Sequence, residues 1–165
     1  MFVRALLAFL ALPGLFAVLL PWLITANDSA RGEGNAAGIV VVAVGLAILL
    51  VCVRDFYVAG KGTLAPWDPP KHLVIVGLYR YARNPMYLGV LMLVAGWSLT
   101  TGSFWLTGYW AALGIAFHLR VLLYEEPWLS KQFGAQWETY AASVSRWLPR
   151  LTPWHGSTEL PSPPH

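Results

Sequence analysis

Four stretches of the chain are long and apolar enough to be predicted as membrane-spanning helices. Residues 5–24 carry no charged side chain, and twenty residues make about 30 Å of helix, the thickness of the hydrocarbon core. Residues 36–53 and 104–124 form the second and fourth predicted spans. The third, residues 85–101, reaches membrane length only with the proline and threonines at its ends. The pattern predicts an all-α integral membrane protein with four transmembrane helices.

The segments between the spans differ in kind. Residues 25–35 read as a polar, glycine-containing loop, and the turn at residues 100–103 is so short that its two helices must form an antiparallel hairpin. Residues 54–85 are too long for a turn, and three prolines exclude a continuous helix there. A cleaved signal peptide is the alternative interpretation of the first span, although its apolar run is longer than usual for one.

The region after the fourth span has helical periodicity. Leu129, Phe133, Trp137 and Tyr140 recur at helical spacing with polar residues between them, which predicts a C-terminal amphipathic helix on the membrane surface or over the central loop. The proline-containing end, residues 155–165, is predicted to be a disordered tail. The chain is therefore expected to form a single membrane domain over residues 1–154.

The basic residues define an orientation. Arg31 is the only basic residue of the first loop, and the short turn has none. Most of the others lie in the central loop and the tail: Arg54, Lys61, Lys71, Arg80, Arg83, Lys131, Arg146 and Arg150. By the positive-inside rule, both termini and the central loop are cytoplasmic. We expect a multi-pass protein of a bacterial inner membrane.

Composition supports this interpretation and narrows the chemistry. The chain is 57% hydrophobic and 12% charged with mean hydropathy +0.55, whereas soluble domains carry about 25% charged residues. The net charge of +3 does not suggest a nucleic-acid partner. The single cysteine, Cys52, excludes an intramolecular disulfide. The histidines are scattered, so no metal site is expected.

Two polar islands at the membrane surface are the candidates for chemistry. In the first, residues 71–87, Gly77 permits close backbone approach to a ligand, and Arg80, Arg83 and Asn84 offer hydrogen-bond donors. Pro85 is expected to start the third span, which presents free amides to an anion. The plain alternative is that these arginines only satisfy topology and lipid headgroups.

The second island is the pair Glu125 and Glu126, predicted to end the fourth span. Two carboxylates there are costly if they face lipid, and they oppose the helix dipole. They are therefore expected to bind donors, with snorkelling into the headgroups as the alternative. At 100° per residue, His118 shares a face with Glu125, whereas Arg120 is expected to lie well round from it.

The ordered motifs GLYRYARNPMYLG and YEEPWLSKQFGAQWETYAASVSRWLP resemble those of integral-membrane methyltransferases typified by isoprenylcysteine carboxyl methyltransferases and related phospholipid methyltransferases. The resemblance covers roughly residues 70–154. It implies an S-adenosylmethionine site, without a Rossmann fold, built from residues 70–88 and 120–150.

The resemblance also implies roles for individual residues. Arg120 is the nearest match to the family's substrate-contacting arginine, and Arg83 is the other candidate to hold an anionic acceptor. Asn84 stands where the family usually has histidine, and asparagine can hydrogen-bond but cannot titrate near neutral pH. The implied cofactor-binding residues are Lys71, His72, Leu73, Val74, Gly77, Tyr79, Asn84, Pro85, Met86, Tyr87, Glu125 and Glu126.

The expected reaction is transfer of a methyl group to a carboxylate, amine or thiol on a lipophilic acceptor, with the acceptor and membrane lipids as partners. The sequence does not identify the acceptor or the oligomeric state. Two other classes stay open: an NADPH-dependent membrane lipid or sterol-type reductase, and a small non-enzymatic membrane transporter. The transporter requires an acidic residue in the middle of a span, and the four predicted spans have none.

Overall fold

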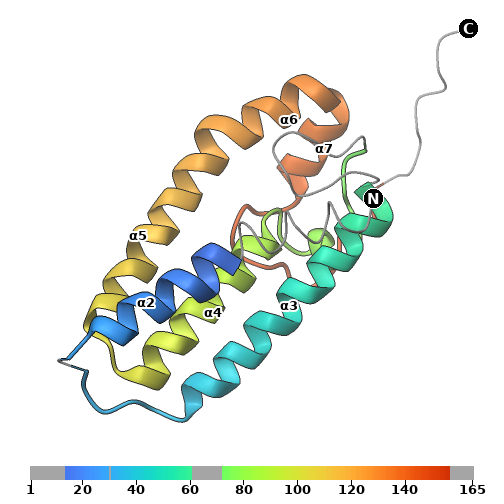
Figure 1. Ribbon diagram of the computed structural model, residues 1–165. Coiled ribbons are helices and arrows are strands. Elements are labelled where there is room, and N and C mark those ends of the chain that lie inside the picture. The colour runs from blue at the N-terminus through green and yellow to red at the C-terminus, as the bar shows by residue number, and fades with distance from the viewer. Residues whose placement is uncertain (1–13, 30, 61–71, 157–165) are drawn as a thin grey trace, which may run out of the picture.

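The computed structural model describes residues 14–29, 31–60 and 72–156, and all regular structure in these ranges is helical (Figure 1). This confirms the all-α prediction. The elements are the π-helical turns η1 (Leu15–Leu19) and η3 (Val121–Glu125), the 3-10 turn η2 (Gly77–Arg80), and the α-helices α2 (Leu20–Asn27), α3 (Ala37–Gly60), α4 (Pro85–Thr101), α5 (Phe104–Arg120), α6 (Glu126–Phe133) and α7 (Ala135–Ser143).

Among the described residues, two helices are long and apolar enough to cross a membrane: Ala37–Asp55 and Phe104–Phe133. The other two apolar helices, Leu15–Asn27 and Pro85–Thr101, are shorter. These helices overlap the predicted spans, although residues 5–13 lie outside the described ranges. Membrane-spanning helices are therefore plausible by length and composition, and the complete four-span arrangement stays a prediction.

Helices α3 and α4 lie side by side at very short distance (Figure 1). Glycines on each helix make this possible. A Cβ atom on Gly96 would lie 2.6 Å from the Val42 amide nitrogen and 2.7 Å from the Gly38 carbonyl oxygen. Gly45 is similarly close to Gly89. Small residues allow membrane helices to pack through their backbones, where apolar burial supplies no driving force against lipid.

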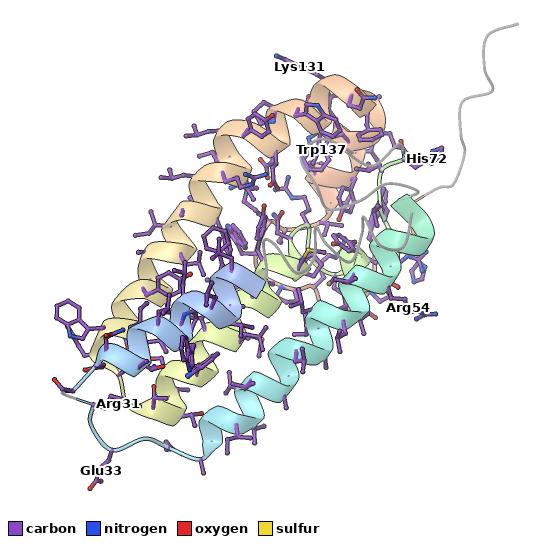
Figure 2. All side chains as sticks on the ribbon, in the orientation of Figure 1. Arg31, Glu33, Arg54, His72, Lys131 and Trp137 are labelled. Atoms are coloured by element: carbon purple, nitrogen blue, oxygen red, sulfur yellow. The ribbon has the colours of Figure 1, made fainter. Side chains whose placement is uncertain are left out.

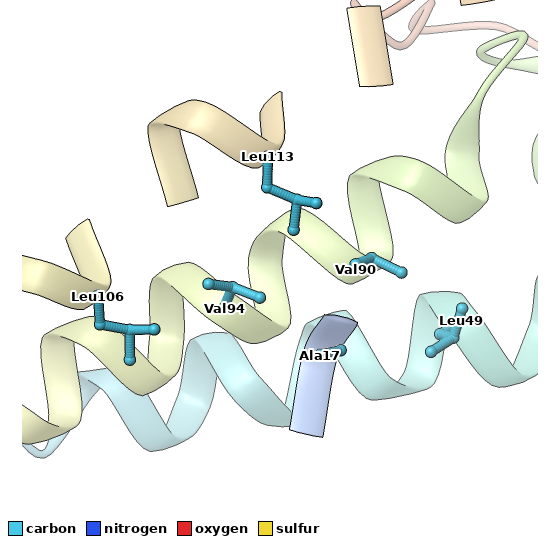
Figure 3. Packing of buried hydrophobic residues seen from close by; sticks show 6 residues of the cluster. All are labelled: Ala17, Leu49, Val90, Val94, Leu106 and Leu113. Atoms are coloured by element: carbon cyan, nitrogen blue, oxygen red, sulfur yellow. The ribbon is translucent and has the colours of Figure 1, made fainter. Parts of the chain in front are cut away.

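Aliphatic side chains fill the centre between α3, α4, α5 and the first described helix (Figure 3). The buried members are Ala17, Leu49, Val90, Val94, Leu106 and Leu113. The outer surface of α3 is also apolar: Ile39 and Val40 are 61% and 64% exposed. A helix that is apolar both on its packed side and on its free side is typical of a membrane span.

Two prolines explain the two π-helical turns. Each turn ends two residues before a proline: η1 precedes Pro21, and η3 precedes Pro127. A proline inside a helix removes one hydrogen bond and its ring clashes with the carbonyl four residues earlier. A wider turn with i→i+5 bonding accommodates the ring.

The helix therefore continues past the fourth predicted span. Residues 104–133 form one helix through α5, η3 and α6, so the expectation that it ends at Tyr124 is wrong. The single amphipathic helix expected beyond it is also wrong. Gly134, with φ +49°, separates α6 from α7, yet Leu129, Phe133, Trp137 and Tyr140 still pack in one cluster.

Polar residues gather at the two ends of the helical bundle. Arg31 and Glu33 are at one end, and Arg54, His72 and Lys131 are at the other (Figure 2). At the first end, the Ser103 hydroxyl donates to Asp28 at 2.5 Å and accepts from the Leu106 amide, so it both ties α2 to the hairpin and caps α5. The other end holds both polar islands.

Candidate functional site

The π-helical turn η3 brings Glu125 next to Arg120. The Arg120 Nε donates to Glu125 Oε1 at 2.7 Å and to the Tyr87 hydroxyl at 3.2 Å. The Tyr87 hydroxyl in turn donates to Glu125 Oε1. The expectation that Arg120 lies well round from Glu125 is wrong, because a π turn brings residues i and i+5 together. An α-helical turn would separate them.

Glu126 joins three segments of the chain. It accepts a bidentate pair from Arg146, at 2.7 Å for both Nε and Nη2, and its Oε1 lies 3.1 Å from Arg83 Nη1. Its side chain is only 16% exposed, and that of Arg83 only 12%. The two glutamates are therefore not equivalent. Glu126 is enclosed, whereas the side chain of Glu125 is 26% exposed and that of its partner Arg120 is 48% exposed.

The segment after α7 lies along the first polar island. The Arg83 amide donates to the Ser145 carbonyl, the Arg150 amide to the Tyr81 carbonyl, and the Trp154 amide to the Arg80 carbonyl, each at 2.9 Å. We call residues 144–154 the C-terminal strap. These bonds pair the strap with residues 80–83 of the central loop.

Side-chain hydrogen bonds also connect the strap to α5 and to the start of α4. The Trp147 indole donates to His118 Nδ1 at 3.1 Å, and the Asn84 side-chain amide donates to the Arg146 carbonyl at 3.2 Å. Asn84 is the N-cap residue of α4, as its position before Pro85 predicts, but its side chain makes no capping bond. It anchors the strap instead.

Gly77 lies against the end of α3, and the expected approach of a ligand to its backbone stays a prediction. Its φ is +52°, a left-handed conformation that favours glycine, and a Cβ there would lie 1.9 Å from Asp55 Oδ2. The group that approaches the Gly77 backbone is thus the end of α3. The neighbouring Tyr79 is 8% exposed, and its carbonyl accepts from the Tyr140 hydroxyl at 2.6 Å. Burial raises the pKa of both tyrosines.

The predicted site residues thus fall into two groups. The structure brings together Arg83, Asn84, Tyr87, Arg120, Glu125 and Glu126. The others serve packing or lie at the edge. Val74 is buried with Cys52 and Tyr79, Leu73 packs against the α7 cluster, Pro85 is buried, Met86 packs against two apolar clusters, His72 is exposed, and Lys71 lies outside the described residues.

Arg146 and Trp147 are contacts that the sequence analysis missed as site residues. Arg146 counted there only as a topological charge, although it stands inside the quoted SRWLP motif. With Arg83 and Arg120, it brings three positive charges next to the two glutamates, so the net charge of these five side chains is +1. Burial lowers the pKa of Arg83 despite the neighbouring Glu126, and the hydrogen bond to Glu126 raises the pKa of Arg146.

Aromatic rings line the cluster that these three arginines and two glutamates form. The rings of Tyr87 and Phe117 lie 4.4 Å apart, Trp147 is 6.4 Å from Tyr87, and the Arg83 guanidinium lies 5.5 Å from the Trp137 ring. The cluster can therefore offer flat apolar surface, carboxylate acceptors and guanidinium donors together. Across the described ranges, no group of three or more His, Cys, Asp and Glu side chains could hold a metal ion.

Comparison with known proteins gives one match. The family model described as phospholipid methyltransferase matches residues 34–136, well over half of the chain. The matched region begins just before α3 and includes both glutamates, η2 and all of α4 and α5. No curated protein and no solved structure matches.

Proposed function

This chain belongs to the phospholipid methyltransferase family, and we propose that it transfers a methyl group from S-adenosylmethionine to a lipophilic acceptor in the membrane. Family membership indicates membrane methyltransferase activity; the methyl donor and the acceptor class are our proposal. One observation carries it: two adjacent carboxylates, at the end of a π turn and the start of α6, face guanidinium groups from the central loop, α5 and the C-terminal strap.

The residues at the cluster fit the chemical groups of S-adenosylmethionine. Its ribose hydroxyls and cationic centre need carboxylate acceptors, which the partly exposed Glu125 can supply. Its carboxylate needs guanidinium donors. Arg83 Nε is buried and has no hydrogen-bond partner in the described part of the chain, so the cluster has an unused donor as well. The Tyr87 and Trp147 rings offer surfaces for the adenine base.

When bound, S-adenosylmethionine supplies an electrophilic methyl group on a sulfonium. Methyl displacement then depends mainly on alignment and on exclusion of water. Glu126 contributes indirectly to both, because it ties the strap to the central loop through Arg146 and Arg83. A carboxylate acceptor arrives ionised and needs no general base, which agrees with Asn84 in place of a titratable side chain.

The two candidate arginines take different parts in this proposal. Arg83 is nearly enclosed and paired with Glu126, so it positions the cofactor region. Arg120 is 48% exposed at its side chain and lies on the long apolar helix, so it is the better group to meet an anionic acceptor from the lipid phase. We further propose that this end of the bundle is cytoplasmic, in a bacterial inner membrane, because it carries most of the basic residues.

Two measurements test the proposed function. Calorimetric titration of the purified protein with S-adenosylmethionine should give saturable heat. Incubation with membrane lipids and deuteromethyl-labelled S-adenosylmethionine should then give a lipid whose mass increases by one labelled methyl group. Competition with NADPH separates the reductase alternative. No heat and no thermal shift at millimolar S-adenosylmethionine would refute the proposal.

A further inference from the structure

A carboxylate with one buried oxygen lies beneath η2 and has no partner in the interactions described so far. Asp55 lies near the end of α3, and its Oδ2 occupies the space beside Gly77 where a Cβ would otherwise stand. This oxygen is buried and accepts no hydrogen bond from any described residue. An unpaired carboxylate oxygen out of water is unfavourable, so we expect a donor that is not part of the described chain.

An unused donor stands at the other end of η2. Arg80 Nε is buried and, within the described ranges, has no acceptor. In a 3-10 helix the side chains of residues i and i+3 eclipse each other, at a rise of about 6 Å over three residues. Gly77 and Arg80 are the two ends of η2, so the Arg80 side chain starts one short turn away from the backbone that Asp55 approaches.

Asp55 and Arg80 are thus opposite charges at the two ends of a single turn. No ion pair within 4.0 Å joins them among the contacts of the described chain. The acceptor and the donor are both buried and unused, and no side chain can stand between them at Gly77, since any Cβ would meet Asp55. A ligand that carries both an ammonium and a carboxylate close together satisfies both groups at once.

We propose that Asp55 and Arg80 form the subsite for the α-amino-acid end of the methyl donor. The Asp55 carboxylate accepts hydrogen bonds from the α-ammonium group, and the Arg80 guanidinium donates to the α-carboxylate. This inference rests on the proposed function and adds two residues to the cofactor site, one of them from α3. It also gives the glycine of the GLYR turn a structural reason: only glycine leaves room for the Asp55 carboxylate.

The test compares two ligands that differ at this end of the molecule. S-Adenosylhomocysteine carries the α-amino-acid group, and 5′-methylthioadenosine lacks it. The full-length protein in nanodiscs is titrated with each ligand by calorimetry. We expect Asp55→Asn and Arg80→Gln each to weaken S-adenosylhomocysteine binding at least 10-fold and to leave 5′-methylthioadenosine binding within 2-fold. Arg54→Gln, on the exposed residue next to Asp55 (Figure 2), is the matched control and should change neither.

The outcomes distinguish this inference from the proposed function. If the unsubstituted protein binds neither nucleoside, the proposed function fails and this inference fails with it. If it binds S-adenosylhomocysteine and Asp55→Asn binds it equally well, or loses both ligands equally, only this inference is overturned. If Asp55→Asn does not fold, the same question is tested on the unsubstituted protein with S-adenosylhomocysteine that lacks its α-amino group. We expect this ligand to bind at least 10-fold more weakly than S-adenosylhomocysteine, and equal binding overturns the subsite.

Discussion

Replacing Glu126 by glutamine should destabilise the protein more than any other single charge-neutralising change at the site. Glutamine keeps the shape of the side chain but removes the charge that faces Arg146 at 2.7 Å and Arg83 at 3.1 Å. It leaves two guanidinium groups near each other without a shared anion. The C-terminal strap would lose its charged connection to the long helix and keep the hydrogen bond from Trp147 to His118.

The magnitude follows from the burial of the three partners. Exposed ion pairs contribute roughly 0–1 kcal/mol, whereas breaking a buried pair costs about 3–5 kcal/mol. The side chains of Arg83, Glu126 and Arg146 are 12%, 16% and 27% exposed. The free energy lost with these two ion pairs should therefore lie between the two limits. We expect a loss of about 2–3 kcal/mol, which for a chain of this length corresponds to a fall in Tm of about 5–10 °C.

The single cysteine provides the assay. Cys52 is fully buried, so a thiol-reactive fluorogenic maleimide reports unfolding as the temperature rises. Glu138→Gln makes the same change on an exposed position of α7 and serves as the control. A double-mutant cycle with Arg146→Gln should show coupling above about 1 kcal/mol. A Glu126→Gln protein that melts within 2 °C of the control would refute the reasoning.

Three other substitutions probe separate parts of the molecule. Glu125→Gln should weaken S-adenosylmethionine binding at least 10-fold by calorimetry but lower Tm by less than 3 °C, because its ion pair is half-exposed; unchanged affinity would contradict its assignment. Gly96→Ala should lower the free energy of unfolding by about 2–4 kcal/mol, since its Cβ meets the α3 backbone at 2.6 Å. Its control is Gly108→Ala, which has no atom within 4 Å of the new Cβ and should be neutral or slightly stabilising in the same melt. Tyr140→Phe should cost about 1–2 kcal/mol for its lost hydrogen bond. Burial raises the pKa of Tyr140, so its contribution to stability is fully present below the ordinary pKa of 10.0 and is lost as the pH rises above that value. Above pH 10, Tm should therefore fall less steeply with pH in the phenylalanine variant.

The helices and the two polar islands were predictable because the signals for them are local. The length of an apolar run depends on adjacent residues, and Pro85 at the start of α4 acts on its own turn. Basic residues at the ends of spans indicated that residues 71–87 and the glutamate pair share one end of the bundle, where the structure has both. The glycines between α3 and α4 gave no such signal, since small residues are common in membrane helices for several reasons.

The tertiary structure alone decided which groups of the site meet. One π turn before Pro127 changes the helical phase, so Arg120 contacts Glu125 although regular α-helical geometry separates them. Long-range contacts then divide the two glutamates: Glu126 is enclosed by arginines 43 residues before and 20 residues after it. The same holds for Asp55 and Gly77, which are 22 residues apart in the sequence and in contact in the fold. Sequence determines each residue's chemistry and local geometry, but partners depend on helix phase and chain packing, which are properties of the whole fold.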